Sequence, residues 1–153
     1  MKNDIVVTGG LGFIGKNFCN FSSQMFSKKV ILDKLTYASD INYYHTILQP
    51  DGWEFIQSDI NEVDNIDVSR LGANPIVINF AAESHVDHSF SNSKEFMIAN
   101  GLGSLSIAEY CRSHDLRMLH VSTDEVYGEI TDNSADENTL LNPTNPYSAT
   151  KAS

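Results

Sequence analysis

The segment TGGLGFIG, Thr8 to Gly15, decides the fold of this chain. It follows the apolar run 4–8, which predicts a strand, and it leads into residues 13–26, whose spacing of apolar side chains predicts a helix. Its glycines recur at every third position, in the pattern G-x-x-G-x-x-G, between the strand and the helix. A glycine-rich turn in that context is typical of a loop that binds the phosphates of a dinucleotide.

Each glycine of this loop has a separate task in that interpretation. Gly9 permits the tight turn, Gly12 lets backbone amides approach a pyrophosphate, and Gly15 lets the helix pack close to the sheet. The positive end of the helix adds a favourable potential for phosphate. Glycines that serve only the turn are the competing interpretation. The predicted cofactor contacts of this loop are Gly9, Gly12, Phe13, Ile14 and Gly15.

Short apolar runs and helical patterns alternate along the rest of the chain. Further strands are predicted at 29–33, 53–57, 75–79 and 116–122, further helices at 43–48, 95–113 and from 145 onward, and a loop at 129–142. This alternation predicts βαβ units, so the fold class is α/β, a Rossmann-like doubly wound parallel sheet. The apolar residues at helical spacing, expected toward one side of each long helix, are Phe13, Ile14, Phe18, Phe21, Met25 and Phe26, and then Met97, Ile98, Leu102, Leu105, Ala108 and Cys111.

The composition excludes several classes of protein. With 153 residues, 41% of them hydrophobic and 20% charged, the chain is expected to form one globular domain. A net charge of −10 argues against a nucleic-acid surface, no apolar run is long enough to cross a membrane, and the early first strand leaves no room for a signal peptide. Cys19 and Cys111 are predicted to be buried free thiols, which favours a cytoplasmic protein.

Carboxylates that follow the second and third strands predict where the adenosine of a dinucleotide binds. Asp33 ends the second strand about 20 residues beyond the glycine loop, where a carboxylate binds the ribose hydroxyls and repels a 2′-phosphate. It therefore favours NAD over NADP, a preference that Lys34 weakens slightly. Asp59 and Ile60 follow the third strand and are candidates to contact adenine. A turn cap for Asp33 and a plain surface position for Asp59 are the competing interpretations.

A cluster of polar residues follows the fourth strand. Ala81 and Ala82 are small enough for a ligand to pass close to the backbone. A metal site and a polar loop that only caps the next helix are the alternatives, but no second ligand group has firm spacing elsewhere, and we assign no metal. We expect a loop that faces cofactor and substrate. Its crowded polar residues are Glu83, Ser84, His85, Asp87 and His88.

Two adjacent carboxylates, Asp124 and Glu125, follow the fifth strand and precede apolar and aromatic residues. Like charges raise each other's proton affinity, and burial raises it further, an arrangement that is frequent at active sites. A solvated acidic turn is the competing interpretation. Neighbouring side chains on a straight strand point to opposite sides, so both carboxylates reach one ligand only if the backbone turns. We therefore predict an irregular turn over 123–126.

Tyr147 and Lys151 lie four residues apart and share one face of the last predicted helix, for which Asn145 is the expected cap and Pro146 the first residue. The ordinary pKa of a tyrosine is ~10, and a nearby ammonium together with a positively charged nicotinamide lowers it. The phenol then becomes a usable base. An ordinary surface helix is the alternative. The pattern stops at Ser153 after about two turns, which is marginal in water. We therefore expect residues 1–153 to be an incomplete NAD-binding domain, without its last strands and the substrate-binding part.

Together these residues resemble the extended short-chain dehydrogenase/reductase family. The matching elements run the length of the chain: the loop TGGLGFIG, Asp33, NFAA at 79–82, Asn100 within NGLGS, VST at 121–123 and YSATK at 147–151. Within that family, DKLTYA at 33–38, AAESHVDHS at 81–89 and STDEVYG at 122–128 resemble the nucleotide-sugar 4,6-dehydratases that act on dTDP-glucose. One departure is His88, where the family usually has arginine. Family members are roughly twice as long as this chain.

The resemblance implies a reaction and a role for each residue. Tyr147, supported by Lys151, takes the proton of the sugar 4-hydroxyl while NAD accepts the hydride from C4, and Thr123 bonds the 4-oxygen. Glu125 then removes the C5 proton, Asp124 protonates the departing C6 hydroxyl, and the hydride returns to C6. The implied substrate contacts are Glu83, Ser84, His85 and Thr123, and the implied cofactor contacts beyond the glycine loop are Asp33, Lys34, Thr36, Asp59, Ile60, Ala81, Ala82, Ser84, Asn100, Tyr147 and Lys151.

Two other hypotheses about the function stay open at this point. One is an epimerase or decarboxylase of the same family, although an epimerase needs no acid pair to eliminate water. The other is a non-catalytic NAD-binding half-domain, and for the 153-residue chain alone we expect NAD binding with little or no turnover. The resemblance further implies a homodimer formed through the helix over 95–113 and the Tyr147–Lys151 helix.

Overall fold

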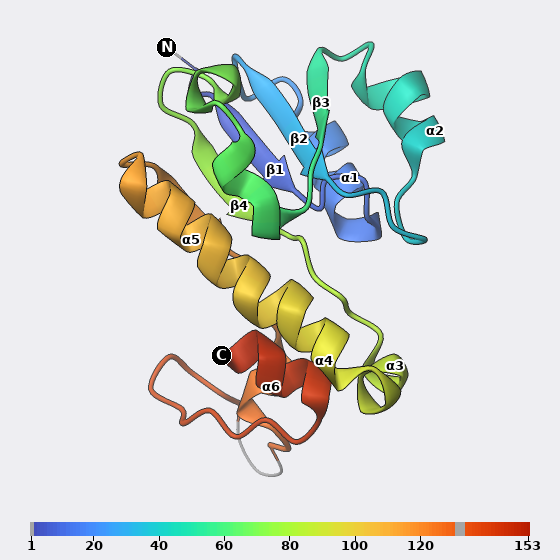
Figure 1. Ribbon diagram of the computed structural model, residues 1–153, viewed down its shortest axis with the longest axis vertical. Helices are drawn as coiled ribbons and strands as arrows, with labels where there is room; N and C mark the ends of the chain where they lie inside the picture. The colour runs from blue at the N-terminus through green and yellow to red at the C-terminus, as the bar shows by residue number, and fades with distance from the viewer. Residues whose placement is uncertain (1, 131–133) are drawn as a thin grey trace.

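A five-stranded parallel sheet organises the computed structural model, which describes residues 2–130 and 134–153 (Figure 1). The strands are β1 Ile5–Thr8, β2 Lys29–Asp33, β3 Trp53–Gln57, β4 Ile76–Asn79 and β5 Arg117–His120. Their order is β3-β2-β1-β4-β5, and Ile5 of β1 pairs with Lys29 on one side and Ile76 on the other. The chain therefore reverses direction across the sheet between β1 and β4, which is where open α/β sheets bind ligands. The predicted fold class and all five strands are confirmed.

Helices and short turns connect the strands on both faces of the sheet. They are α1 Phe13–Ser22, α2 Ile41–Tyr43 with the π-helical Tyr44–Leu48, the 3₁₀ segments Ile60–Asn65 and Val68–Leu71, α3 Val86–Ser91, α4 Ser93–Phe96, the π-helical Met97–Leu102, α5 Gly103–Ser113, the 3₁₀ turn Asp124–Tyr127 and α6 Pro146–Ala152. Of the predicted loop 129–142, residues 131–133 lie outside the described part, and the others form neither helix nor strand. Within 2–130 and 134–153, each helix is too short or too polar to span a bilayer.

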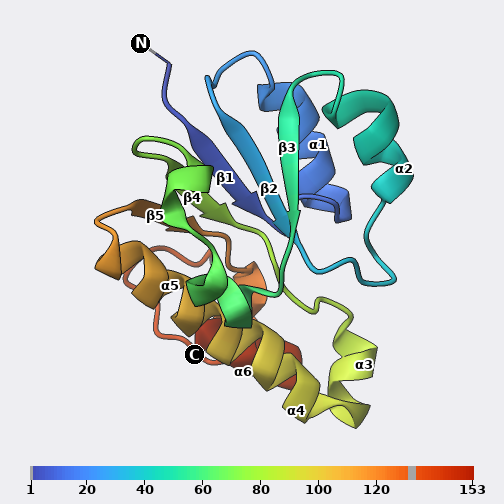
Figure 2. The ribbon, with the colours of Figure 1, turned by 45° about the horizontal axis from the view of Figure 1, so that its top comes forward.

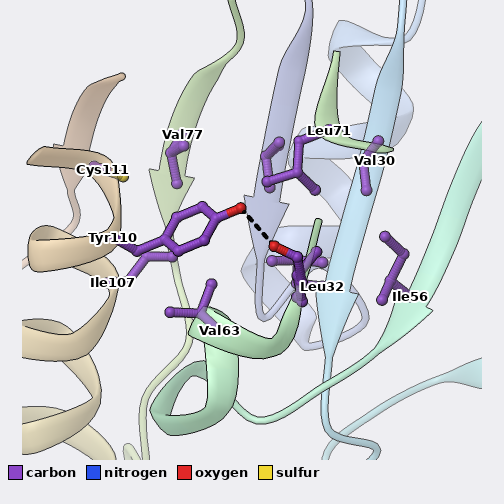
Figure 3. Close-up of a cluster of buried hydrophobic side chains, with 11 residues drawn as sticks. Val30, Leu32, Ile56, Val63, Leu71, Val77, Ile107, Tyr110 and Cys111 are labelled. Carbon is purple, nitrogen blue, oxygen red and sulfur yellow. Dashed lines mark hydrogen bonds between the residues drawn. The ribbon is translucent and has the colours of Figure 1, made fainter. Parts of the chain in front are cut away.

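Two apolar cores lie on opposite faces of the sheet because successive strand residues point to opposite sides. One core joins Val7 and Ile31 to Cys19 of α1 and Leu48 of the π-helical segment. The other joins the opposite strand faces to α5, as Figure 3 shows for Tyr110, whose hydroxyl donates to the Ile66 carbonyl at 3.0 Å. Both cysteines are buried and unpaired as predicted.

The first helix is shorter than predicted, and only part of its apolar pattern is buried. The helix ends at Ser22 instead of residue 26, and it buries Gly15, Cys19 and Ser22. Phe18 and Phe26 pack against the core, whereas Phe13 and Phe21 are 80% and 90% exposed. Where the helix approaches the glycine loop there is no room for a side chain, since a Cβ on Gly15 would lie 2.2 Å from the Gly9 carbonyl oxygen.

The apolar side predicted for the long helix is wrong. The helix runs as α4, a π-helical segment and α5 in succession, and its buried residues include Phe96, Ile107 and Tyr110. The buried positions keep helical spacing along the whole run, but three of them, Ala99, Asn100 and Gly103, are small or polar, so a search for large apolar residues selects the wrong face. Cys111 of the predicted side is buried, and the others are exposed, namely Met97, Ile98, Leu102, Leu105 and Ala108.

Candidate functional site

A pocket of about 410 Å³ lies at the carboxyl edge of the sheet, where the strand arrows converge beside α1 (Figure 2). The loops that follow β1, β2, β3 and β4 line it, together with the end of β5 and α6. The predicted cofactor residues along it are Gly9, Gly12, Phe13, Ile14, Gly15, Asp33, Lys34, Thr36, Asp59, Ile60, Ala81, Ala82, Ser84, Tyr147 and Lys151. The predicted substrate residues along it are Glu83, Ser84 and His85.

The glycine loop has the geometry that a bound pyrophosphate requires. Gly9 has a φ of +64°, and a Cβ there would lie 2.7 Å from the Ala81 backbone nitrogen. By contrast, a Cβ on Gly12 would contact only the Gly9 carbonyl oxygen, at 3.4 Å, so the space beyond Gly12 opens into the pocket. The start of α1 therefore presents backbone amides to a ligand with no side chain in front of them.

The carboxylate of Asp33 is held in a fixed orientation at the end of β2. It is 6% exposed and accepts hydrogen bonds from the Leu11 N–H at 3.0 Å, the Leu35 N–H at 2.9 Å and the Ser39 hydroxyl at 2.8 Å. These donors balance its charge while it lines the pocket. The residue thus closes the glycine loop onto β2 and presents an acceptor to a ligand.

Asp59 lies on the pocket and also caps the 3₁₀ segment Ile60–Asn65, a role that the sequence analysis does not predict. Its carboxylate accepts from the Asn61 N–H at 2.9 Å, which starts the 3₁₀ segment Ile60–Asn65, and it lies 3.6 Å from the Lys34 ammonium. Burial opposes the charge on Asp59, but the bonds from Asn61 and the nearby Lys34 outweigh it and lower the pKa of Asp59. Lys34 is therefore partly neutralised by Asp59, and this weakens its attraction for a 2′-phosphate.

The loop after β4 meets the loop after β2 across the rim of the pocket. The ring of Tyr37 stacks on His85 at 5.9 Å between centroids, and burial together with Glu83 raises the pKa of Tyr37. The predicted loop is shorter than expected because α3 begins at Val86, so His88 lies in a helix. In the described part of the chain, no three histidine, cysteine or acidic side chains gather as a metal site requires.

Asn100 lies behind the pocket wall and supports it. It is not among the described residues that line the pocket. It is 2% exposed, its amide oxygen accepts from the Glu83 N–H at 2.8 Å, and its amide nitrogen donates to the Glu83 carbonyl at 2.9 Å and to Thr150 at 3.0 Å. One side chain therefore ties the π-helical segment to the β4–α3 loop and to α6. This supporting role is what the structure shows, and its predicted cofactor contact stays a prediction.

The last helix forms as predicted and delivers its tyrosine and lysine to the pocket. Asn145 and Ser148 form a reciprocal capping box ahead of Pro146. Lys151 is 8% exposed, its ammonium donates to the Val121 carbonyl at 2.7 Å, and burial lowers the pKa of its side chain. This bond fixes the lysine against the end of β5.

The protein groups around Tyr147 raise its pKa, whereas the predicted lowering presupposes a bound nicotinamide and stays a prediction. Burial raises this pKa, a hydrogen bond with Thr123 opposes the rise, and the charges of Glu125 and Asp124 add to it. The ammonium of Lys151 bonds the Val121 carbonyl, while two carboxylates face the phenol. Without a bound cation, Tyr147 is therefore held in its protonated form.

The two carboxylates lie on the irregular turn that the sequence predicts. Thr123 caps the 3₁₀ turn Asp124–Tyr127, and its hydroxyl accepts from the Glu125 N–H at 3.3 Å. The two carboxylates are not both buried. Asp124 is exposed and Glu125 is half-buried, because Val126 fills the core position. The turn lies beside Tyr147, just outside the residues that line the pocket.

Several pocket residues have no motif that would mark them. Ser39 lines the pocket and donates to Asp33, and Ser58 follows the last residue of β3. Val121 and Ser122, which belong to the VST motif, follow β5 in the same way. The usable signal was position, because every residue directly after a parallel strand lies at the ligand-binding edge.

Comparison with known proteins agrees with this geometry. Residues 6–153 match the family model described as GDP-mannose 4,6 dehydratase. The chain is 40% identical over 151 residues to the low-salt glycan biosynthesis protein Agl12 of Haloferax volcanii, covering 97% of this chain and 48% of that protein. It is 41% identical over 154 residues to the dTDP-glucose 4,6-dehydratase of Mycobacterium tuberculosis, covering 97% of this chain and 45% of the relative.

A solved structure is similar over the same region. DesIV, a dTDP-glucose 4,6-dehydratase from Streptomyces venezuelae crystallised with NAD and TYD bound, superposes with a TM-score of 0.86 at 33% identity. The match covers 97% of this chain and 48% of DesIV. The chain thus spans about half the length of the curated relatives it matches.

Proposed function

The chain belongs to the GDP-mannose 4,6 dehydratase family, and on that premise we propose that it forms the NAD-binding part of a nucleotide-sugar 4,6-dehydratase that converts dTDP-glucose to dTDP-4-keto-6-deoxyglucose. The observation that carries the proposal is that two sets of reactive side chains lie together at one end of the pocket. Tyr147 and Lys151 line this end, and the turn with Thr123, Asp124 and Glu125 faces Tyr147.

The residues around the pocket fit NAD. The open face at Gly12 suits the pyrophosphate, the fixed carboxylate of Asp33 suits the adenosine ribose, and Asp59 with Ile60 suits the adenine. When bound, NAD supplies a hydride acceptor that later returns the hydride. Lys151 spends one N–H on the Val121 carbonyl, which leaves two donors for the nicotinamide ribose and Tyr147. Glu83, Ser84 and His85 are then the substrate contacts on this chain.

Each remaining step has a residue placed to perform it. Tyr147 removes the proton of the 4-hydroxyl, and Thr123, which already bonds the phenol, holds the 4-oxygen. The 4-keto group acidifies the C5 proton, which the Glu125 carboxylate removes, while the Asp124 carboxyl gives its proton to the C6 hydroxyl as water departs. One carboxyl must be ionised and the other protonated at the same pH. The division assigned here, with Glu125 as the base and Asp124 as the acid, is part of the proposal.

The positive charge of an oxidised nicotinamide supplies what the protein alone does not. Burial and the two acidic residues hold Tyr147 protonated, so a cation in the pocket is needed to bring its pKa down toward neutrality. The tyrosine therefore becomes a base only when the oxidised cofactor is present. This ordering prevents proton removal before a hydride acceptor is in place.

Further parts of the proposal concern the state of the protein. The exposed apolar row Met97, Ile98, Leu102 and Leu105 on the long helix supports a homodimer in which a second copy covers it. The buried free thiols of Cys19 and Cys111 are compatible with a reducing compartment such as the cytoplasm.

The test assays two proteins separately: the 153-residue chain and the product of the whole open reading frame that contains it. The longer protein is expected to convert dTDP-glucose to a 4-keto-6-deoxy sugar, identified by NMR, and Tyr147→Phe to abolish this, whereas the matched control Tyr43→Phe retains it. The 153-residue chain is expected to bind NAD in calorimetry with little or no turnover. Formation of dTDP-galactose by the longer protein would refute the dehydratase assignment, and turnover of ~1–10³ s⁻¹ by the short chain would refute its inactivity.

A further inference from the structure

We infer that Asn145 is a positioning residue that aims the Glu125 carboxylate for proton removal, and that it couples this carboxylate to the helix carrying Tyr147 and Lys151. The inference rests on the proposed function, in which Glu125 is the base for the C5 proton. The contact on which the inference depends is a hydrogen bond of 2.8 Å that the Asn145 side-chain amide nitrogen donates to Glu125 Oε2.

The orientation of the Asn145 amide is fixed by the helix that follows it. Its oxygen accepts from the Ser148 N–H at 2.8 Å, and a backbone N–H can only donate. The amide nitrogen must therefore point the other way, toward Glu125. The Asn145 backbone is held as well, because its N–H donates to the Ser148 hydroxyl at 3.3 Å. The α6 cap thus presents a donor in one direction only.

This donor favours the ionised form of Glu125. A carboxylate that accepts an N–H bond is stabilised relative to the carboxylic acid, so losing the bond raises the pKa of the group. A base must be ionised to act, and the acid limb of the rate profile would then move to higher pH. The other titratable groups facing this site are Asp124 on the same turn and Tyr147 on α6.

The bond also connects two elements that come from separate parts of the sequence. Glu125 lies on the 3₁₀ turn after β5, and Asn145 begins α6, with residues 129–142 between them. Glu125 is half-buried and Asn145 is half-buried, which limits competition from water. The acid–base turn and the Tyr147–Lys151 helix therefore keep a fixed relative position through one side chain.

Two substitutions separate this role from plain helix capping. Asn145→Ser and Asn145→Asp both keep a side-chain oxygen that can accept from the Ser148 N–H, so a residue that only caps the helix tolerates either. Serine is too short to reach Glu125, and aspartate places a like charge against it. The matched controls are Asn20→Ser and Asn20→Asp on the exposed side of α1.

The first readout is the pKa of Glu125 in the protein itself, from carboxyl ¹³C NMR with the resonance assigned through Glu125→Gln. We expect this pKa to rise by about half to one unit in Asn145→Ser and further in Asn145→Asp. The second is the pH dependence of kcat for the longer protein, whose acid limb should shift in the same order while KM for dTDP-glucose changes less than twofold. Unshifted values in both variants would overturn the inference. A wild-type protein without dehydratase activity would refute the proposed function instead, and the NMR readout would still decide the role of Asn145.

Discussion

At the residue scale, two glycines of the same loop meet different requirements: Gly15 allows close packing, and Gly12 leaves space for a ligand. Gly15 is required by packing, since a Cβ there would lie 2.2 Å from the Gly9 carbonyl oxygen and 2.8 Å from the Gly10 Cα. Gly12 has no such neighbour, and a side chain there would point into the pocket. Substitution of the two glycines by alanine should therefore have different consequences.

We expect Gly15→Ala to lower the free energy of unfolding by about 3 kcal/mol, because backbone atoms must move to admit the methyl group. Gly12→Ala should change it by less than about 1 kcal/mol, yet weaken NAD binding at least about tenfold by placing a methyl group where the pyrophosphate approaches. Urea denaturation measures the first quantity and calorimetric titration with NAD the second. A Gly12→Ala protein that binds NAD like the wild type would exclude Gly12 from the phosphate site.

At the scale of elements, the strands were predictable and the helix faces were not. A parallel strand buried on both sides is a continuous apolar run, as in IVV of β1 and VIL of β2, and such runs have no phase to misjudge. A helix face is harder to assign when its buried side carries small or polar residues, as the long helix does at Ala99, Asn100 and Gly103. Large apolar side chains such as Leu102 and Leu105 lie on the exposed face of that helix instead.

The site divides in the same way. Residues that follow a strand directly, such as Asp33 and Asp59, could be placed on the pocket from their position alone. Contacts between distant segments could not, and Asn100 is the clearest case, because its hydrogen bonds to Glu83 and Thr150 span 17 and 50 residues. The motif indicated that Asn100 matters, and the fold showed that it acts as a tie between elements.

We expect Asn100→Ala to destabilise the protein by about 2–4 kcal/mol, since it leaves the half-buried Glu83 N–H and carbonyl without this partner. The loss should be uneven. Hydrogen exchange of α6 amides should accelerate more than that of β1 or β2, because Thr150 loses its tie to the long helix. Asn92→Ala, at an exposed asparagine just before α4, is the matched control. Equal acceleration in α6 and the central strands would mean that Asn100 contributes only to global stability.

At the scale of the whole molecule, the exposed apolar row on the long helix is the largest departure from the sequence-based picture. Leu102 and Leu105 are 52% and 57% exposed, Met97 and Ile98 are 43% and 41% exposed, and together they form one side of a continuous helix. Side chains that the pattern assigned to the core therefore face outward. Contiguous apolar surface of this kind is typical of a protein–protein contact.

If a second copy covers this row, a charge placed in it should separate the copies without unfolding either one. We expect light scattering after size exclusion to give a dimer for the wild-type chain and a monomer for Leu102→Glu, because an unpaired carboxylate would be buried in the contact. The free energy of unfolding per monomer should change by less than about 1 kcal/mol, since Leu102 is already half-exposed in a single chain. Phe21→Glu on α1, another exposed apolar position, should leave the dimer intact. A wild-type chain that stays monomeric at concentrations of about 100 μM, or a Leu102→Glu chain that remains dimeric, would contradict this assignment of the contact.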